Sequence, residues 1–132
     1  MTALTGDRNT HMQDAGVVSV PMVAGAVIYA GALVVANPSG FCAPGWTADD
    51  VVYIGRAEES VSNAGGGNGA KHISVRRLRA FKWATDGSIS QANFMAMAYI
   101  VDDQTVSASD ASQARSVAGR IVGVESDGVW VE

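Results

Sequence analysis

The sequence predicts an all-β fold: a small antiparallel β-barrel or sandwich with an extended N-terminal arm and at most one short helix. Fifteen of the 132 residues are glycine, and Val and Ala are abundant while Leu and Lys are few. Such a composition favours strands and turns over helices. Short apolar runs also recur with turn signals between them, as in the Asn37-Pro38-Ser39-Gly40 turn. That spacing is typical of barrels and sandwiches.

The length and the charge pattern predict two parts. Residues 1–16 are polar and aperiodic, so they form an arm that cannot bury enough apolar area to order itself. Residues 17–132 are long enough for a single β domain with a modest core. The sequence leaves two readings of the arm open: a frayed terminus, or a segment that orders on a partner surface.

The stretch from residue 15 to residue 48 carries no charged side chain. It is long enough to span a bilayer, but Pro21, Pro38 and Pro44 interrupt it and no basic flank follows, so we expect buried β structure. Residues 17–20 form a short strand that ends at Pro21. Residues 25–36 are apolar on both alternating faces, which predicts a strand covered on both sides, by the domain's own sheet or by a second subunit.

The central part of the chain predicts an antiparallel strand pair. Residues 51–61 and 71–83 flank the glycine cluster at 62–70, which we expect to be a long, mobile loop. On the return arm, Ile73, Val75, Phe81 and Trp83 share one face, whereas Leu78 falls on the opposite parity from its neighbours. This phase break predicts a β-bulge near Arg77-Leu78, or a face covered by something other than core.

Turn signals divide the C-terminal third of the chain. Asp86-Gly87 is a turn, and residues 88–94 predict one helical turn with Ser88 as its cap. Residues 107–116 are polar and loop-like. Residues 119–124 and 129–131 predict a hairpin around Asp127-Gly128. An Asp-Gly pair favours the tight hairpin turn whose backbone twist matches the twist of the two flanking strands.

No motif in the chain predicts catalysis, a cofactor or a metal site. In the glycine cluster, Ala70 precedes Lys71 and the flanks are strands, so the phosphate-binding loop pattern fails. The acidic pairs are best explained as solvated turn charges, and neither His11 nor His72 has a second ligand at regular spacing. The lone Cys42 predicts a buried thiol.

The basic run from Lys71 to Lys82 is the strongest binding signal. Arg76, Arg77 and Arg79 lie in it, interleaved with the rings of Phe81 and Trp83. Rings and cations together suit a single-stranded nucleic acid. They suit an acidic protein surface equally well. Because the net charge is −4, we favour the protein partner.

The order of features along the chain resembles the small head-decoration, or capsid cement, proteins of Mu-like and lambda-like tailed bacteriophages. The resemblance spans nearly the whole chain. It rests on the order of the segments, because each segment alone is of a kind that is common in β-sheet proteins. The matching segments are ALTGDRNT (3–10), AGAVIYAGALV (24–34), GRAEESV (55–61) with the glycine cluster, VRR (75–77), FKW (81–83), YIVDDQTV (99–106), GRIVGV (119–124) and DGVWV (127–131).

This resemblance implies a structural virion protein and no enzyme. Such a protein is made in the cytoplasm of the bacterial host, binds the outer face of the expanded capsid and clamps neighbouring subunits of the major capsid protein. The resemblance implies a homo-oligomer, with a trimer as the first choice and a dimer as the second. It implies no nucleic-acid or membrane partner. Two other classes of protein stay open. One is a β-module that binds glycan or a host surface through aromatic side chains on exposed loops, and Trp46 is the clear candidate for such a side chain. The other is a single-stranded nucleic-acid binder.

Two sets of contact residues follow as hypotheses. The arm and the basic run supply the capsid contacts, namely Leu4, Thr5, Arg8, Asn9, Arg76, Arg77 and Arg79. The uncharged strand supplies the oligomer contacts, namely Val27, Tyr29, Leu33 and Val35.

Overall fold

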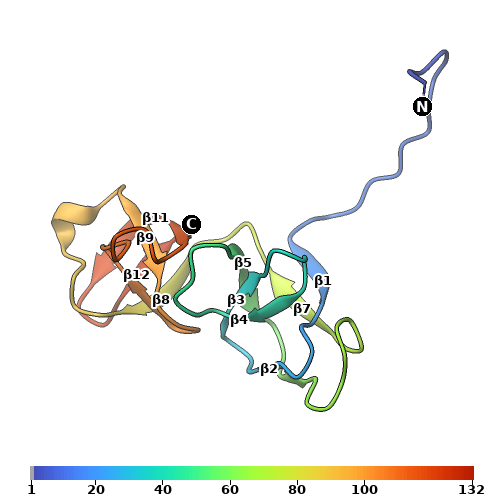
Figure 1. The fold of residues 1–132 in the computed structure, drawn as a ribbon. Coiled ribbons are helices and arrows are strands. Elements are labelled where there is room, and N and C mark those ends of the chain that lie inside the picture. The colour runs from blue at the N-terminus through green and yellow to red at the C-terminus, as the bar shows by residue number, and fades with distance from the viewer. Residues whose placement is uncertain (1) are drawn as a thin grey trace.

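The computed structural model describes residues 2–132, and they form a five-stranded sheet beside a closed five-stranded barrel (Figure 1). The sheet has the order β1-β7-β5-β3-β4, the barrel the order β10-β8-β12-β11-β9, and β2 pairs with β6. The predicted all-β class is confirmed. One strand pair departs from the antiparallel pattern, because β10 runs parallel to β8.

The strands are short and follow one another closely. They are β1 (Val17–Pro21), β2 (Val27–Ile28), β3 (Leu33–Ala36), β4 (Cys42–Pro44), β5 (Val52–Ala57), β6 (Val61–Ser62), β7 (His72–Arg76), β8 (Phe81–Thr85), β9 (Met97–Ile100), β10 (Thr105–Ser107), β11 (Val117–Glu125) and β12 (Gly128–Val131). A single 3₁₀ turn, η1 (Gln91–Asn93), is the helical segment of the described chain, and its cap is Ser90 rather than the predicted Ser88.

Strand β3 lies between two hydrophobic cores. Leu33 and Val35 point into the core that fills the barrel, whereas Ala32 and Val34 belong to the core on the other side of the sheet. The chain's own structure therefore covers both faces of this strand, one of the two outcomes that its apolar pattern predicts. The prediction of one continuous strand over 25–36 is wrong: the chain turns between β2 and β3, where Gly31 adopts a φ of 88°.

The central strand pair is confirmed, but its return arm divides between two sheets. Strands β5 and β7 are antiparallel, with Arg56 opposite Arg76. Beyond Arg76 the chain leaves the sheet and enters the barrel as β8. The phase break at Leu78 is therefore not a bulge within one strand; it marks the crossover, residues 77–80, between the two cores.

The glycine cluster is tied to the body of the protein, so the prediction of a free, mobile hairpin tip is wrong. Strand β6 pairs with β2, and Gly69 donates its backbone N–H to the Met22 carbonyl at 2.8 Å. The side chain of Asn63 is 2% exposed and donates to the carbonyls of Val23 and Gly67 at 2.9 and 3.0 Å. Asn63 thus holds the loop closed from inside.

We expect Asn63→Ala to lower the free energy of unfolding by about 1–3 kcal/mol, because it removes the two part-buried hydrogen bonds that the side chain donates to the carbonyls of Val23 and Gly67. Asn68→Ala is the matched control: the Asn68 side chain is exposed and accepts one bond, from the Ala24 N–H. Its cost should be about 1 kcal/mol or less. Urea unfolding followed by tryptophan fluorescence measures both, and equal losses would contradict a special role for Asn63.

Three further sequence predictions concern the uncharged stretch. Cys42 is fully buried, as predicted, and burial raises the pKa of its thiol to about 11. Within residues 2–132 no helix has the length and apolar character that crossing a membrane requires. The Asn37 turn is also confirmed, since the Asn37 side chain accepts bonds from the backbone N–H groups of Ser39 and Phe41, both at 3.0 Å.

Candidate functional site

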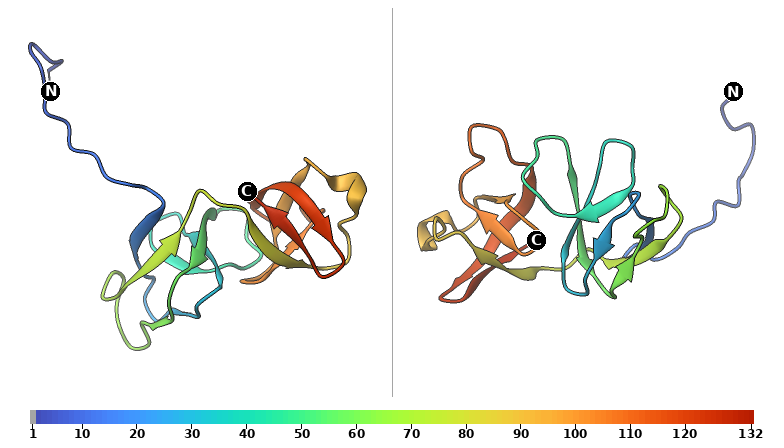
Figure 2. Two further views of the ribbon diagram at one scale, coloured as in Figure 1. Left: turned by 180° about the vertical axis from the view of Figure 1, so that it is seen from behind. Right: turned by 60° about the horizontal axis from the view of Figure 1, so that its bottom comes forward.

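The N-terminal arm stands away from the body of the protein. Residues 2–15 form no strand or helix, and every one of them is exposed. Figures 1 and 2 show the arm leaving from the sheet, on the side opposite the barrel, with its first residues farthest out. Two apolar side chains on the arm, Leu4 and Met12, are exposed. The predicted contact residues Leu4, Thr5, Arg8 and Asn9 all lie on this projecting part.

The root of the arm is fixed beside the basic segment. Strand β1 pairs with β7, which places Val17 opposite Arg76. The Arg77 backbone N–H donates to the Gly16 carbonyl at 2.7 Å, and the Arg77 guanidinium donates to the Ala15 carbonyl at 3.5 Å. The two halves of the predicted capsid-contact set are about seventy residues apart in sequence, and this pairing joins the arm's base to Arg76 and Arg77.

The crossover carries an apolar side chain in an unusual backbone conformation. Leu78 has a φ of 59° and is 65% exposed. A branched side chain in the left-handed region costs roughly 1 kcal/mol or more. The exposed side chain recovers nothing by burial in the core. Backbone strain of this kind concentrates at binding and catalytic sites.

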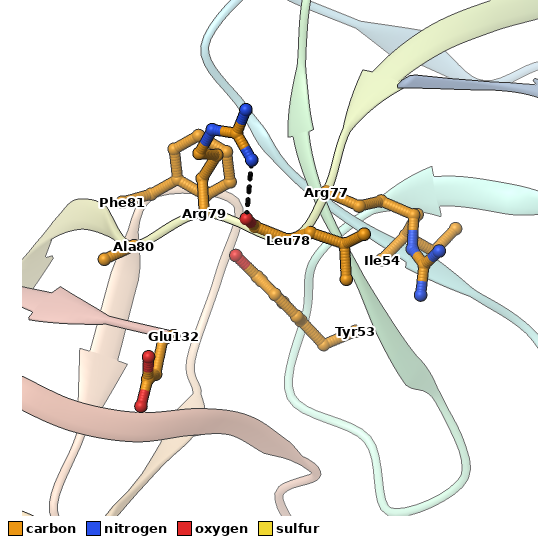
Figure 3. Close-up of a pocket in the computed structure, with 8 residues that line it drawn as sticks. All are labelled: Tyr53, Ile54, Arg77, Leu78, Arg79, Ala80, Phe81 and Glu132. Carbon is orange, nitrogen blue, oxygen red and sulfur yellow. Dashed lines mark hydrogen bonds between the residues drawn. The ribbon is translucent and has the colours of Figure 1, made fainter. Parts of the chain in front are cut away.

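A groove of about 660 Å³ runs along one side of the crossover (Figure 3). Its lining residues come from β5, the crossover, the start of β8 and the last residue, namely Tyr53, Ile54, Arg77, Leu78, Arg79, Ala80, Phe81 and Glu132. Figure 3 shows the Tyr53 side chain reaching toward the crossover, while the Arg79 guanidinium donates to the Leu78 carbonyl at 2.9 Å.

Two polar atoms near the groove have no hydrogen-bond partner. They are the Tyr53 hydroxyl and the Trp83 indole N–H, both shielded from solvent. Burial raises the pKa of Tyr53 to about 12, and the neighbouring Trp83 indole acts in the opposite direction. The geometry between these two groups falls short of a proper hydrogen bond, so both polar atoms are buried without a partner.

A second groove, of about 570 Å³, lies on the other side of the crossover and shares Arg79, Ala80 and Phe81 with the first. Its other lining residues are Gly31, Arg56, Arg76, Lys82, Trp83 and Trp130. The Arg56 guanidinium lies over the Phe81 ring, 4.9 Å from its centre. This groove therefore combines cations with an aromatic wall.

The cations around the grooves differ in whether a carboxylate already neutralises them. Glu58 contacts Arg56 at 2.7 Å and Arg76 at 3.6 Å, and the Arg56 hydrogen bond holds the pKa of Glu58 below its usual value. Lys82 contacts Glu125 at 2.8 Å and Asp127 at 2.6 Å.

Arg77 and Arg79 are different, because across residues 2–132 neither has a carboxylate within 4.0 Å. They are the free cations of the crossover.

The predicted oligomer contacts divide into two classes. Leu33 and Val35 are fully buried, so this chain's own barrel core occupies the surface they were expected to offer, and their side chains cannot reach a second subunit. Val27 and Tyr29 are 37% and 67% exposed. Only these two retain surface for a neighbouring copy.

Several groove residues carried no signal in the sequence as binding residues. Tyr53 and Ile54 look like ordinary strand residues, and Trp130 looks like part of the C-terminal hairpin. Leu78 alone gave a usable sign, since its parity disagrees with that of the strands around it.

The described chain holds no cluster of three or more His, Cys, Asp or Glu side chains placed to bind a metal ion. Comparisons of this chain with protein-family models, with curated proteins and with solved structures found no match.

Proposed function

We propose that this chain is a structural virion protein that binds the outer surface of a bacteriophage capsid and stabilises contacts between subunits of the major capsid protein. One observation carries the proposal most strongly: a fully exposed arm, residues 2–15, is anchored beside the free cations of the crossover. An arm that buries nothing on its own chain gains order only against a partner. The order of sequence features, which resembles that of capsid cement proteins, supports the same partner.

The dimensions of the arm suit a protein that bridges subunits. An extended segment of this length reaches roughly 45 Å at about 3.3 Å per residue, far enough to cross a subunit boundary. The described residues expose 7646 Å². A standard interface would cover about 800 Å² of that surface. The arm together with the crossover supplies an area of this order.

Stabilisation follows from mass action. A protein that binds only the assembled shell stabilises it over the free subunits. When each copy bridges two subunits, release of one contact leaves the other held, so modest contacts add up over the shell. This role involves no chemistry, and we propose neither a cofactor nor a nucleic-acid or membrane partner.

We also propose that the protein is a homo-oligomer, with a trimer as the first choice and a dimer as the second. The exposed side chains of Val27, in β2, and of Tyr29, which follows β2, are the surface we assign to the contact. Light scattering should give an oligomer mass at high concentration, and Tyr29→Glu should shift it toward the monomer because a charge would be buried. A monomer in solution and also on the shell would rule the contact out.

Co-sedimentation with expanded shells tests the proposed function. The shells are to be assembled from a major capsid protein whose gene, once located, neighbours the gene for this chain. We expect saturable binding at a fixed number of copies per shell, together with a higher melting temperature of the decorated shells. If the protein stays in the supernatant at every concentration, the proposed function is wrong.

A further inference from the structure

The positive charge of this chain is concentrated at the crossover. The chain has nine Lys and Arg residues against thirteen Asp and Glu. Five of the nine line the two grooves, namely Arg56, Arg76, Arg77, Arg79 and Lys82. A basic site favours a partner segment of the opposite charge.

The crossover also has donors that the fold leaves unused. Arg77 and Arg79 each give one bond to a backbone carbonyl and have no carboxylate partner within residues 2–132. A guanidinium binds a carboxylate with two parallel bonds, so the free arginines match Asp or Glu side chains best.

An apolar element accompanies these donors. Leu78 lies in the crossover between Arg77 and Arg79, and Ile54 and Phe81 line the same groove (Figure 3). The Glu132 side chain is the one acidic group of this lining. A ligand that fits needs carboxylates spaced around an apolar side chain, which is the chemistry of an acidic peptide segment.

We propose that the crossover groove binds an extended acidic segment of the partner protein, with its carboxylates on Arg77 and Arg79 and an apolar side chain against Leu78 and Ile54. The inference rests on the proposed function in one respect: it takes this segment to belong to the major capsid protein. The strained conformation of Leu78 then has a role, because it holds the apolar contact outside the core.

A single-stranded nucleic acid fits the grooves less well. Such ligands stack their bases on exposed rings. Phe81 and Trp83, the rings interleaved with the cations, are 8% and 4% exposed and belong to the barrel core, so among the rings that line the second groove Trp130 alone, at 38% exposed, retains surface for a base. The fold has used these rings for packing and left the cations outside.

The test uses two probes and a charge-reversed protein, Arg77→Glu with Arg79→Glu. One probe is the expanded shell, and the other is a fluorescein-labelled peptide, Glu-Glu-Leu-Glu-Glu-Leu-Glu-Glu, followed by anisotropy. We expect the double variant to bind both probes about 10- to 100-fold more weakly, because like charges replace two charge-assisted contacts. Lys71 begins the basic run in the sequence, but the structure places it at an exposed position outside both grooves, so the single charge reversal Lys71→Glu should alter either affinity less than about twofold.

A second variant tests the apolar contact. Leu78→Asn suits the left-handed conformation, so the melting temperature should stay level or rise. Its affinity for the peptide should fall about 5- to 10-fold, as expected when a buried apolar anchor is lost. Unchanged affinity in this variant would remove Leu78 from the site.

The outcomes separate the two proposals. Peptide binding that needs Arg77 and Arg79, without shell binding, keeps the groove and overturns the capsid function. Shell binding that the double variant retains in full overturns the groove, and so does failure of the intact protein to bind the peptide. An oligothymidylate that binds more tightly than the peptide would overturn it in favour of nucleic acid.

Discussion

Deleting residues 2–14 is expected to weaken binding to expanded shells by at least about 100-fold, which corresponds to about 2.7 kcal/mol of binding free energy. The arm offers the largest surface that this chain does not use itself, since all of these residues are exposed. Its loss removes the apolar contacts of Leu4 and Met12 and the polar contacts of Thr5, Arg8 and Asn9. Co-sedimentation of the truncated and the intact protein measures the difference.

The truncation should leave the fold intact, which makes the result interpretable. Within residues 2–14 one backbone bond forms, from the Thr10 N–H to the Arg8 carbonyl, and the Asp14 carboxylate accepts from the Gly16 N–H. Ala15 and Gly16, whose carbonyls accept from Arg77, remain in place. An unchanged melting temperature is therefore the internal control, and truncated protein that binds as tightly as the intact protein would contradict a role for the arm.

Gly55→Ala is expected to destabilise the protein by at least about 3 kcal/mol, an unusually large effect for adding one methyl group. Gly55 lies in β5 directly against β7, where an added Cβ would overlap the Arg76 carbonyl oxygen and stand 3.4 Å from a Val75 methyl. Relief requires the two strands to separate. That separation would break the pairing of Arg56 with Arg76 and open the core that Val75 and Ala57 share.

Gly67→Ala is the matched control for this substitution. An added Cβ at Gly67 meets nothing within 4 Å, and its backbone is not in the left-handed region. We expect a change within about 0.5 kcal/mol, or slight stabilisation through a less flexible unfolded chain. Urea unfolding of the two variants side by side checks the difference. Similar midpoints would mean that β5 and β7 do not approach as closely as described.

The sequence was a good guide wherever one local rule governs the structure. The Asn37 turn, the β1 strand ending at Pro21 and the Asp127-Gly128 hairpin are all present. Each depends on a few adjacent residues whose backbone preferences are strong. The two-faced apolar strand β3 was also predictable, because a strand without a polar face must be covered on both sides.

The return arm from Lys71 to Trp83 shows where local rules stop. Ile73, Val75, Phe81 and Trp83 share a parity and are all buried, yet they belong to two different cores. Alternation reports that a side chain is buried but not which neighbours bury it. The distinction arises from long-range pairing of β7 with β1 and of β8 with β12, which no local pattern contains.

The charged residues of the candidate site could be predicted from the sequence, but the groove that they border could not. Arg76, Arg77 and Arg79 stand out in any reading of the sequence, but the groove beside them also needs Tyr53, from a strand more than twenty residues earlier. The glycine cluster misled for a similar reason. Glycine content indicates a turn, whereas the Asn63 bonds that close this loop depend on segment 22–26 lying alongside it.

The most direct test of the central claim is cryo-electron microscopy of expanded shells saturated with the intact protein. The account predicts added density on the outer face, with the arm extended across a boundary between capsid subunits and the crossover at residues 77–80 facing the shell. Shells without added outer density would contradict the account. So would density in which the arm points into solvent and the crossover faces away from the capsid.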